Sequence, residues 1–295
     1  MHIPVMLHEV IDYLDLKPGQ TIVDATLGTG GHSLEILKRI TPHGNLIGID
    51  RDEDSLAVCR QRLNEFGDSC RFVHANFVDL DQVLEKLGVE KIDGIVFDLG
   101  ISTYQLKDAE RGFSFQQEGP LDMRLDKSSY ISAYDLVNNL NENEISHMLW
   151  SFGQERWHNR IAHLLVEERK AQPIATTSQL ADLVMLAIPY RYRRSYYRIH
   201  PATRTFQAVR IAVNRELEIL ETAIKKAVAV LRKKSRICVI SFHSLEDRVI
   251  KHTFRALKAE GLIDIITAKP LTPIASEVAT NPSSRSSKFR VAERI

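Results

Sequence analysis

The chain has 295 residues, of which 44% are hydrophobic and 26% are charged. This length suits one large domain or two ordinary ones, and it can bury a sizeable core without disulfides or metal ions. The net charge of +1 gives no overall signal for nucleic acid, although charge concentrated in one segment still can. No apolar run approaches the length of a membrane span, so we expect no membrane partner.

The three cysteines are scattered along the chain, and no CxxC pair occurs. Zinc sites use closely spaced cysteines, and disulfide frameworks use an even number of cysteines. The sequence has neither, so we expect no metal and no disulfide. Reduced cysteines are typical of a cytoplasmic protein. Residues 1–16 carry Glu9, Asp12 and Asp15, which does not suit a signal peptide.

Residues 21–40 follow the order strand, glycine-rich turn and helix, with the sequence DATLGTGGHS at the turn. This order predicts the entry to a nucleotide-binding α/β domain. Glycines lack a Cβ, so the backbone there can turn sharply and approach a ligand. A dinucleotide fingerprint would place a third glycine where this chain has Ser33, so the turn fits S-adenosylmethionine better than NAD. A tight turn with no ligand is the alternative. The residues that would face the ligand are Asp24, Gly28, Gly30 and Gly31.

Three further apolar runs alternate with helical patterns up to residue 100. This alternation predicts a doubly wound parallel sheet with helices on both faces, whose ligand lies at the carboxyl ends of the strands. Asp50, Phe77 and Asp98 follow these runs, as Asp24 follows the first. An acid at the end of the second strand suits the two hydroxyls of a ribose, which predicts this role for Asp50.

From about residue 103 to 203 the strand pattern stops, and helical patterns replace it. A stretch of this length is too long for a structureless loop, so we expect a mostly helical inserted domain. The sheet pattern then resumes with one long amphipathic helix over residues 206–231 and three further strands. The predicted domains are a Rossmann-like domain over 1–103 and 204–295, and an insert over 104–203.

Seven arginines and no acid lie between residues 183 and 215, with aromatic residues interleaved. Arginine pairs with phosphate, and aromatic rings stack on unpaired bases. The alternative is a solvated charged face near a helix end. The lack of any balancing acid favours a nucleic-acid surface. The arginines are Arg191, Arg193, Arg194, Arg198, Arg204, Arg210 and Arg215.

Longer stretches of the sequence resemble a known family. They include DATLGTGGHS, RGFSF (111–115), GPLDMR (119–124), HPATRTFQAVRIAVN (200–214) and SFHSLEDR (241–248). Over nearly its whole length the chain resembles the bacterial MraW/RsmH ribosomal RNA methyltransferases. The resemblance implies a Rossmann-like class I S-adenosylmethionine-dependent methyltransferase sheet, with a helical insert that recognises the substrate. It also implies methyl transfer to N4 of a cytidine in the decoding centre of 16S rRNA, which we expect to lie within a ribosomal particle. The chain would act as a monomer or a homodimer.

The resemblance also implies roles for single residues. The cofactor pocket would be lined by Gly30, Gly31 and His32 at the methionine end, Asp50 at the ribose, Phe77 near the adenine, and Asp98 and Gln105. Asp98 is our candidate for accepting a hydrogen bond from the cytosine N4, with cofactor binding alone as the alternative. His243 would bind the base or take up a proton, with a purely structural role as the alternative. Arg111 and Arg124 join Arg191, Arg193, Arg194, Arg198 and Arg204 as candidate RNA contacts.

Three rival functions remain open on the residues alone. A non-catalytic rRNA-binding assembly factor has no need of an intact glycine turn with Asp50. An NAD-dependent oxidoreductase is disfavoured by Ser33 and by the arginines. A DNA amino-methyltransferase is disfavoured only by the family-specific stretches.

Overall fold

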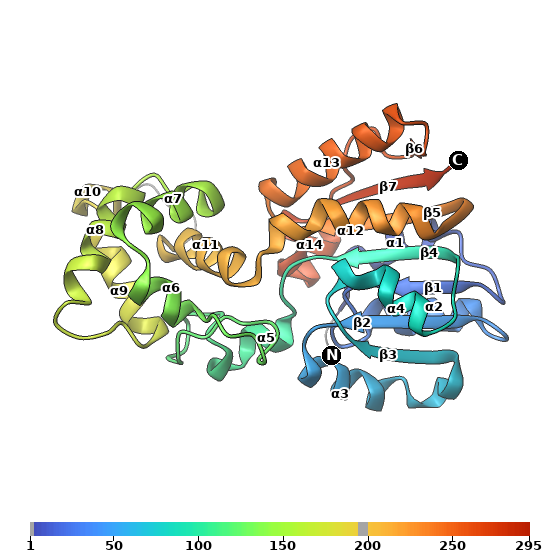
Figure 1. Ribbon diagram of the computed structural model, residues 1–295, viewed down its shortest axis with the longest axis horizontal. Coiled ribbons are helices and arrows are strands. Elements are labelled where there is room, and N and C mark those ends of the chain that lie inside the picture. Colours follow the sequence, from blue (N-terminus) through green and yellow to red (C-terminus); the bar gives the residue numbers. More distant parts are fainter. Residues whose placement is uncertain (1–2, 194–199) are drawn as a thin grey trace. The chain divides into compact units, whose positions relative to one another are not determined.

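The computed structural model describes residues 3–193 and 200–295, which form two compact units (Figure 1). The sheet unit comprises Met1–Ser102 and Leu217–Ile295, and the helical unit comprises Thr103–Glu216. The division therefore falls at residue 217, whereas the sequence placed it at 204. The difference is α11 (Ala202–Asn214), which packs against α7 (Glu142–Gly153) of the helical unit.

The sheet unit holds a seven-stranded sheet in the order β3-β2-β1-β4-β5-β7-β6. Strands β1 to β5 are parallel, while β7 runs antiparallel to both of its neighbours. Because β1 lies between β2 and β4, the chain order reverses there, and the carboxyl ends of these strands form the topological switch point. The strands are β1 (Thr21–Asp24), β2 (Asn45–Asp50), β3 (Cys70–His74), β4 (Ile92–Asp98), β5 (Leu231–Ser241), β6 (Ile263–Ile265) and β7 (Lys288–Arg294).

Helices cover both faces of this sheet. Neighbouring side chains of a strand point to opposite faces, so Ile22 and Val23 belong to different hydrophobic clusters. The cluster around Ile22 takes side chains from α1, α2 and α3, and the cluster around Val23 takes them from α4, α12 and α13. The helices of the unit are α1 (Leu7–Leu14), α2 (Gly31–Ile40), α3 (Glu53–Arg62), α4 (Leu80–Lys86), α12 (Glu216–Val230), α13 (Ser244–Ala259) and α14 (Ala275–Thr280).

The helical unit follows the predicted pattern. Asn141 and Glu144 form a reciprocal capping box at the start of α7, in which each side chain accepts a hydrogen bond from the other residue's backbone N–H. Among its described residues, extended pairing is limited to an isolated bridge between Pro120 and Thr176. Its other helices are α5 (Thr103–Lys107), α6 (Ala133–Asn139), α8 (His158–Glu168), α9 (Thr177–Ala187) and α10 (Tyr190–Arg193).

The single long helix predicted over residues 206–231 is wrong. Arg215 has a φ of 51°, a left-handed conformation that ends α11, and α12 begins at the next residue. The apolar spacing continues across this break, so periodicity alone does not reveal it. Within residues 3–193 and 200–295, no helix is both long and apolar enough to cross a bilayer.

Candidate active site

Three acidic residues stand at the ends of adjacent parallel strands: Asp24 on β1, Asp50 on β2 and Asp98 on β4. Asp24 is buried. One of its carboxylate oxygens accepts a hydrogen bond from the Ser33 hydroxyl at 2.6 Å, and the other accepts one from the Thr26 backbone N–H at 3.3 Å. Burial raises the pKa of Asp24 to about 6. Both hydrogen bonds of Asp24 are made within the segment that runs from β1 through the glycine turn into α2, so Asp24 stabilises this turn.

Asp50 holds the glycine turn from the neighbouring strand. Its Oδ2 accepts a 2.7 Å hydrogen bond from the Gly28 backbone N–H, and its Oδ1 accepts one of 2.9 Å from the Asp52 N–H. Each carboxylate oxygen has a second lone pair, so Asp50 can accept two more hydrogen bonds from a ribose. Burial raises the pKa of Asp50.

Asp98 has a buried carboxylate oxygen, Oδ1, that makes no hydrogen bond with any described residue. Its backbone N–H donates to the Thr26 hydroxyl at 2.6 Å. Burial raises the pKa of Asp98 well above its usual range, and the nearby charges of Asp24 and Glu246 raise it further. A buried acceptor without a donor is costly, so this oxygen fits a ligand that brings an amino or ammonium group.

The imidazole of His32 lies between two groups of the protein. Its Nε2 is 2.9 Å from the carbonyl oxygen of Val5, and its Nδ1 is 3.6 Å from Oδ2 of Asp98. The residue is buried. Sequence reasoning left open whether His32 meets the cofactor through its side chain or its backbone, and the structure directs both ring nitrogens toward protein atoms.

The glycines of the turn serve different purposes. A Cβ on Gly30 would lie 2.5 Å from Sγ of Cys59, and a Cβ on Gly31 would lie 2.6 Å from Cγ of Pro4. At Gly28 the nearest atom to a Cβ would be 3.9 Å away, and the φ of 50° is left-handed. Gly31 is therefore required by packing inside the protein and Gly28 by the turn itself, while Gly30 is required by both, since its φ of 74° is also left-handed.

Phe77 follows β3, and its ring meets Phe97 edge-on, with centroids 5.7 Å apart. Phe77 therefore stands at the same edge of the sheet as the three acids. Its predicted contact with the adenine of the cofactor stays a prediction. Gln105 is buried in α5 of the helical unit, and its place in the cofactor pocket also stays a prediction.

His243 is the N-cap residue of α13. Its Nδ1 accepts a hydrogen bond from the Glu246 backbone N–H at 3.3 Å, and Glu246 accepts in return from the backbone N–H groups of Phe242 and His243. A neutral imidazole that accepts at Nδ1 carries its proton on Nε2. That nitrogen lies 3.3 Å from Oε1 of Glu246, so both ring nitrogens of His243 face Glu246. Sequence reasoning missed Glu246, although a capping-box spacing marks it.

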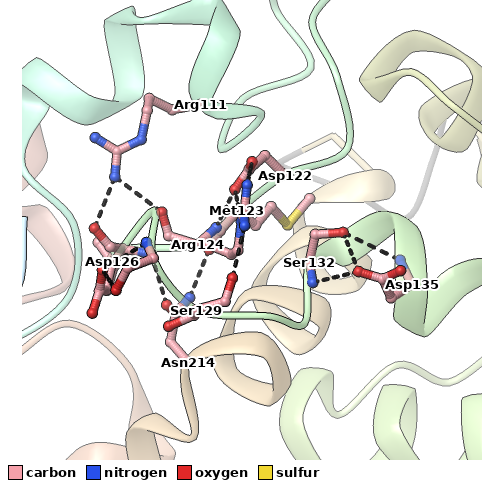
Figure 2. Close-up of polar contacts among 11 residues, drawn as sticks. Arg111, Asp122, Met123, Arg124, Asp126, Ser129, Ser132, Asp135 and Asn214 are labelled. Carbon is pink, nitrogen blue, oxygen red and sulfur yellow. Dashed lines mark hydrogen bonds and ion pairs between the residues drawn. The ribbon is translucent and has the colours of Figure 1, made fainter.

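Arg111 is not available for RNA binding in this structure, which corrects the prediction. Its side chain is buried, and its Nη2 donates to the carbonyl oxygens of Arg124 and Leu125 at 2.9 and 3.0 Å (Figure 2). The guanidinium therefore holds the loop that contains GPLDMR. In the sequence Arg111 stands beside glycine and aromatic residues. Nothing in this pattern indicates that the loop over the following residues encloses its side chain.

Arg124 makes a paired contact with Asp122. Its Nε and Nη2 donate to the two carboxylate oxygens at 2.9 and 2.6 Å, and its Nη1 donates to the Ser129 carbonyl (Figure 2). This pairing neutralises much of its charge. A contact between Arg124 and RNA stays a prediction.

The other arginines differ in their contacts. Arg191 is exposed, with its guanidinium 4.7 Å from the centre of the Tyr192 ring. Arg193 donates to the carbonyls of Ile188 and Leu186, and Arg204 donates to that of Gln154. Arg194 and Arg198 lie outside the described residues. Beyond the end of the arginine-rich stretch, Glu216 forms a two-bond ion pair with Arg210, so this arginine is balanced.

The family-specific stretches of the helical unit contact one another. The ring of Phe115 in RGFSF lies 4.6 Å from His200 and 4.9 Å from Phe206, centre to centre. Asn214 accepts from the Leu125 N–H at 2.8 Å and donates to the Met123 carbonyl at 2.7 Å. These stretches therefore build a common scaffold within the helical unit.

A sequence model of the MraW methylase family matches residues 1–295. The chain belongs to this family. A relative from Clostridioides difficile (strain 630) is 43% identical over 309 residues, covering 100% of this chain and 99% of the relative. Relatives from Geotalea uraniireducens (strain Rf4) and Geobacter sp. (strain M21) are each 47% identical, covering 100% of this chain and 98% of each relative. All three are named ribosomal RNA small subunit methyltransferase H.

Membership of the MraW methylase family accounts for the strand-end site. The predicted fold, a Rossmann-like class I methyltransferase sheet, is confirmed by the observed strand order with its antiparallel β7. The predicted cofactor, S-adenosylmethionine, is likewise confirmed, and the chain is a methyltransferase. The described residues fit this cofactor, since the unpaired Oδ1 of Asp98 requires a donor and Asp50 retains lone pairs for hydroxyls.

Proposed function

We propose that this chain transfers a methyl group from S-adenosylmethionine to N4 of a cytidine in the decoding centre of small-subunit rRNA. The observation that carries the proposal is the buried, unpaired Oδ1 of Asp98 at the end of β4, with Asp50 two strands away in the same sheet. The names of the relatives support the small subunit as the substrate.

Bound S-adenosylmethionine supplies a methyl group on a positively charged sulfur. In an in-line displacement the protein contributes mainly by positioning the two reactants. Asp50 would accept hydrogen bonds from the ribose hydroxyls, and Phe77 would pack near the adenine. Oδ1 of Asp98 would accept from an amino group, either that of the cofactor or N4 of the cytosine.

The lone pair of the cytosine N4 is delocalised into the ring, so this nitrogen is a poor nucleophile. An acceptor that holds an N4 hydrogen favours localising the lone pair on nitrogen. Asp98 would serve in this way if its oxygen faces the base. His243 would act by holding the start of α13 beside the site, because its Nδ1 serves as the N-cap and its Nε2 lies 3.3 Å from Oε1 of Glu246.

The helical unit would hold the RNA, with Arg191 and Arg204 supplying charge near the phosphates. The target cytosine has to leave its stack to reach the methyl group. We expect the rRNA to be presented within a ribosomal particle, which places the enzyme in the cytoplasm.

Incubation with labelled S-adenosylmethionine tests the proposal. The three substrates are small subunits that lack the modification, free small-subunit rRNA, and DNA. We expect label in N4-methylcytidine from rRNA, recovered from subunits in higher yield than from free rRNA. Label in DNA would favour a DNA amino-methyltransferase. Absence of label from all three, with intact cofactor binding, would favour a non-catalytic assembly factor.

A further inference from the structure

The protonation of His32 follows from its neighbour Val5. A backbone carbonyl oxygen can only accept a hydrogen bond, so Nε2 of His32 carries a proton at its 2.9 Å contact with Val5. The second nitrogen, Nδ1, faces Oδ2 of Asp98 at 3.6 Å. This distance is within ion-pair range and longer than a hydrogen bond.

The surroundings of Asp98 favour a proton near its Oδ2. Asp24 and Glu246 both act on Asp98 with negative charge, while Nδ1 of His32 is 3.6 Å from its Oδ2. Without a proton between Nδ1 and Oδ2, two lone pairs would face each other in a buried place. Imidazolium with carboxylate and neutral imidazole with carboxylic acid both avoid this, and in each case the imidazole lies beside Oδ2. Oδ2 is then directed to His32, and Oδ1 is the oxygen left for a ligand.

The carbonyl of Val5 is itself held in place. Residues 3–6, here called the N-terminal strap, cross the start of α2, where Pro4 packs against Gly31. The Met6 N–H donates to Oε1 of Glu277 at 2.6 Å. The Asn281 side chain donates to the Ile3 carbonyl at 3.0 Å. Both ends of the strap are thus tied to α14 and the residue after it.

We propose that His32 is a positioning residue, held by the Val5 carbonyl, which orients the carboxyl group of Asp98 so that Oδ1 faces the cofactor or the base. Its imidazole acts through Asp98, whereas its backbone belongs to the glycine turn. This inference deepens the proposed function and rests on it for the identity of the cofactor. The N-terminal strap holds the imidazole of His32 in place through the Val5 carbonyl.

Two substitutions separate the contacts of the two ring nitrogens. In His32→Gln the amide reaches the position of Nε2 and can still donate to Val5, but nothing occupies the position of Nδ1. In His32→Asn the amide lies at the position of Nδ1 and can still contact Asp98, but the contact with Val5 is lost. We expect His32→Gln to weaken S-adenosylmethionine binding about tenfold, a loss of about 1.4 kcal/mol, and His32→Asn to stay within about threefold of wild type.

A double-mutant cycle with Asp98→Asn tests whether His32 acts through Asp98. If it does, adding His32→Gln to Asp98→Asn should weaken binding by less than about twofold more, because the partner of Nδ1 is already altered. Binding is measured by titration calorimetry without RNA. Thermal unfolding of each variant shows whether it is folded at the titration temperature.

Two results would overturn the inference. Additive losses in the double variant would mean that the imidazole affects cofactor binding independently of Asp98. Wild-type binding in His32→Gln with weak binding in His32→Asn would mean that only the contact with Val5 matters. Because no arm of this experiment uses RNA, its outcome does not depend on which nucleic acid the enzyme modifies. Wild-type protein that binds cofactor but labels no rRNA would overturn the proposed function and leave this inference standing.

Discussion

Glu277 accepts a hydrogen bond from the backbone N–H of Met6, although the two residues are 271 positions apart in the sequence. Met6 is buried, has a φ of 52° and precedes α1, where its N–H has no partner within the helix. The last α-helix of the chain, α14, therefore secures the segment that contacts Gly31 and His32. Through this hydrogen bond the C-terminal region supports the cofactor site, although neither Glu277 nor Met6 is a candidate catalytic residue.

Removing this acceptor should loosen the N-terminal strap. Glu277→Ala leaves the Met6 N–H without a partner, which should lower the free energy of unfolding by about 1–3 kcal/mol. Cofactor affinity should fall as well, since the strap holds His32. Glu277→Gln keeps an acceptor oxygen and should retain most of both properties. Urea unfolding and calorimetry measure the two effects, and Ser276→Ala on the exposed side of α14 is the matched control. Equal stability of Glu277→Ala and the control would contradict the expectation.

The buried carboxyl of Asp24 should make stability depend on pH. Its pKa is raised from 3.8 to about 6, so the folded state binds more protons than the unfolded state between these values. Stability contributed by this group is present below pH 4 and is lost as the pH rises through 6, by about 3 kcal/mol at most. Asp24→Asn should lose less stability over this window than wild type. Urea unfolding at pH 4, 5, 6 and 7 measures the difference, and parallel curves would refute it.

Arg111 should behave as a structural residue. Arg111→Lys keeps the charge but loses the fork that reaches the carbonyls of Arg124 and Leu125, so it should lower the free energy of unfolding by about 3 kcal/mol. The same change at the exposed Arg191 should alter stability by less than about 0.5 kcal/mol. Chemical denaturation compares the two variants. A stable Arg111→Lys protein with impaired RNA binding would instead favour an RNA contact.

Arg191 should contribute to RNA affinity through its charge alone. Arg191→Gln should weaken binding to all small-subunit RNA fragments alike and reduce the slope of log affinity against log salt by about 1. Filter binding over a range of salt concentrations gives this slope. A folded Arg111→Lys protein, assayed below its unfolding temperature, should keep the wild-type slope. An unchanged slope in Arg191→Gln would remove this arginine from the RNA surface.

His243 offers a test of capping against proton transfer. His243→Ala removes the acceptor for the Glu246 N–H and should cost about 1 kcal/mol of stability. Asparagine is a favourable N-cap residue, so His243→Asn should keep the wild-type stability. Because Nδ1 is engaged in the cap, we expect His243→Asn also to keep single-turnover methyl transfer at saturating cofactor within about threefold. Lost transfer in a stable, cofactor-bound Asn variant would show that the imidazole takes part in the reaction.

The alternation of strands and helices and the acids at the strand ends were predictable because they depend on local pattern. Period-2 and period-3.6 spacing define the elements, and the parallel arrangement brings the carboxyl ends of β1, β2 and β4 to one edge. The break at Arg215 was not predictable, since a left-handed residue between two helices leaves the apolar spacing unchanged. Nor was the burial of Arg111, because the loop that encloses it comes from residues 13 and 14 positions further along.

The sequence by itself determined the fold class, the cofactor and the acids at the ends of the strands, because these follow from spacing within short stretches and from motifs read directly. Only the tertiary structure decided what each residue contacts. It placed His32 between Val5 and Asp98, made Gly30 and Gly31 packing positions, and tied Met6 to Glu277. These contacts join segments far apart in the chain, and their formation depends on the packing of the whole sheet unit rather than on any local preference.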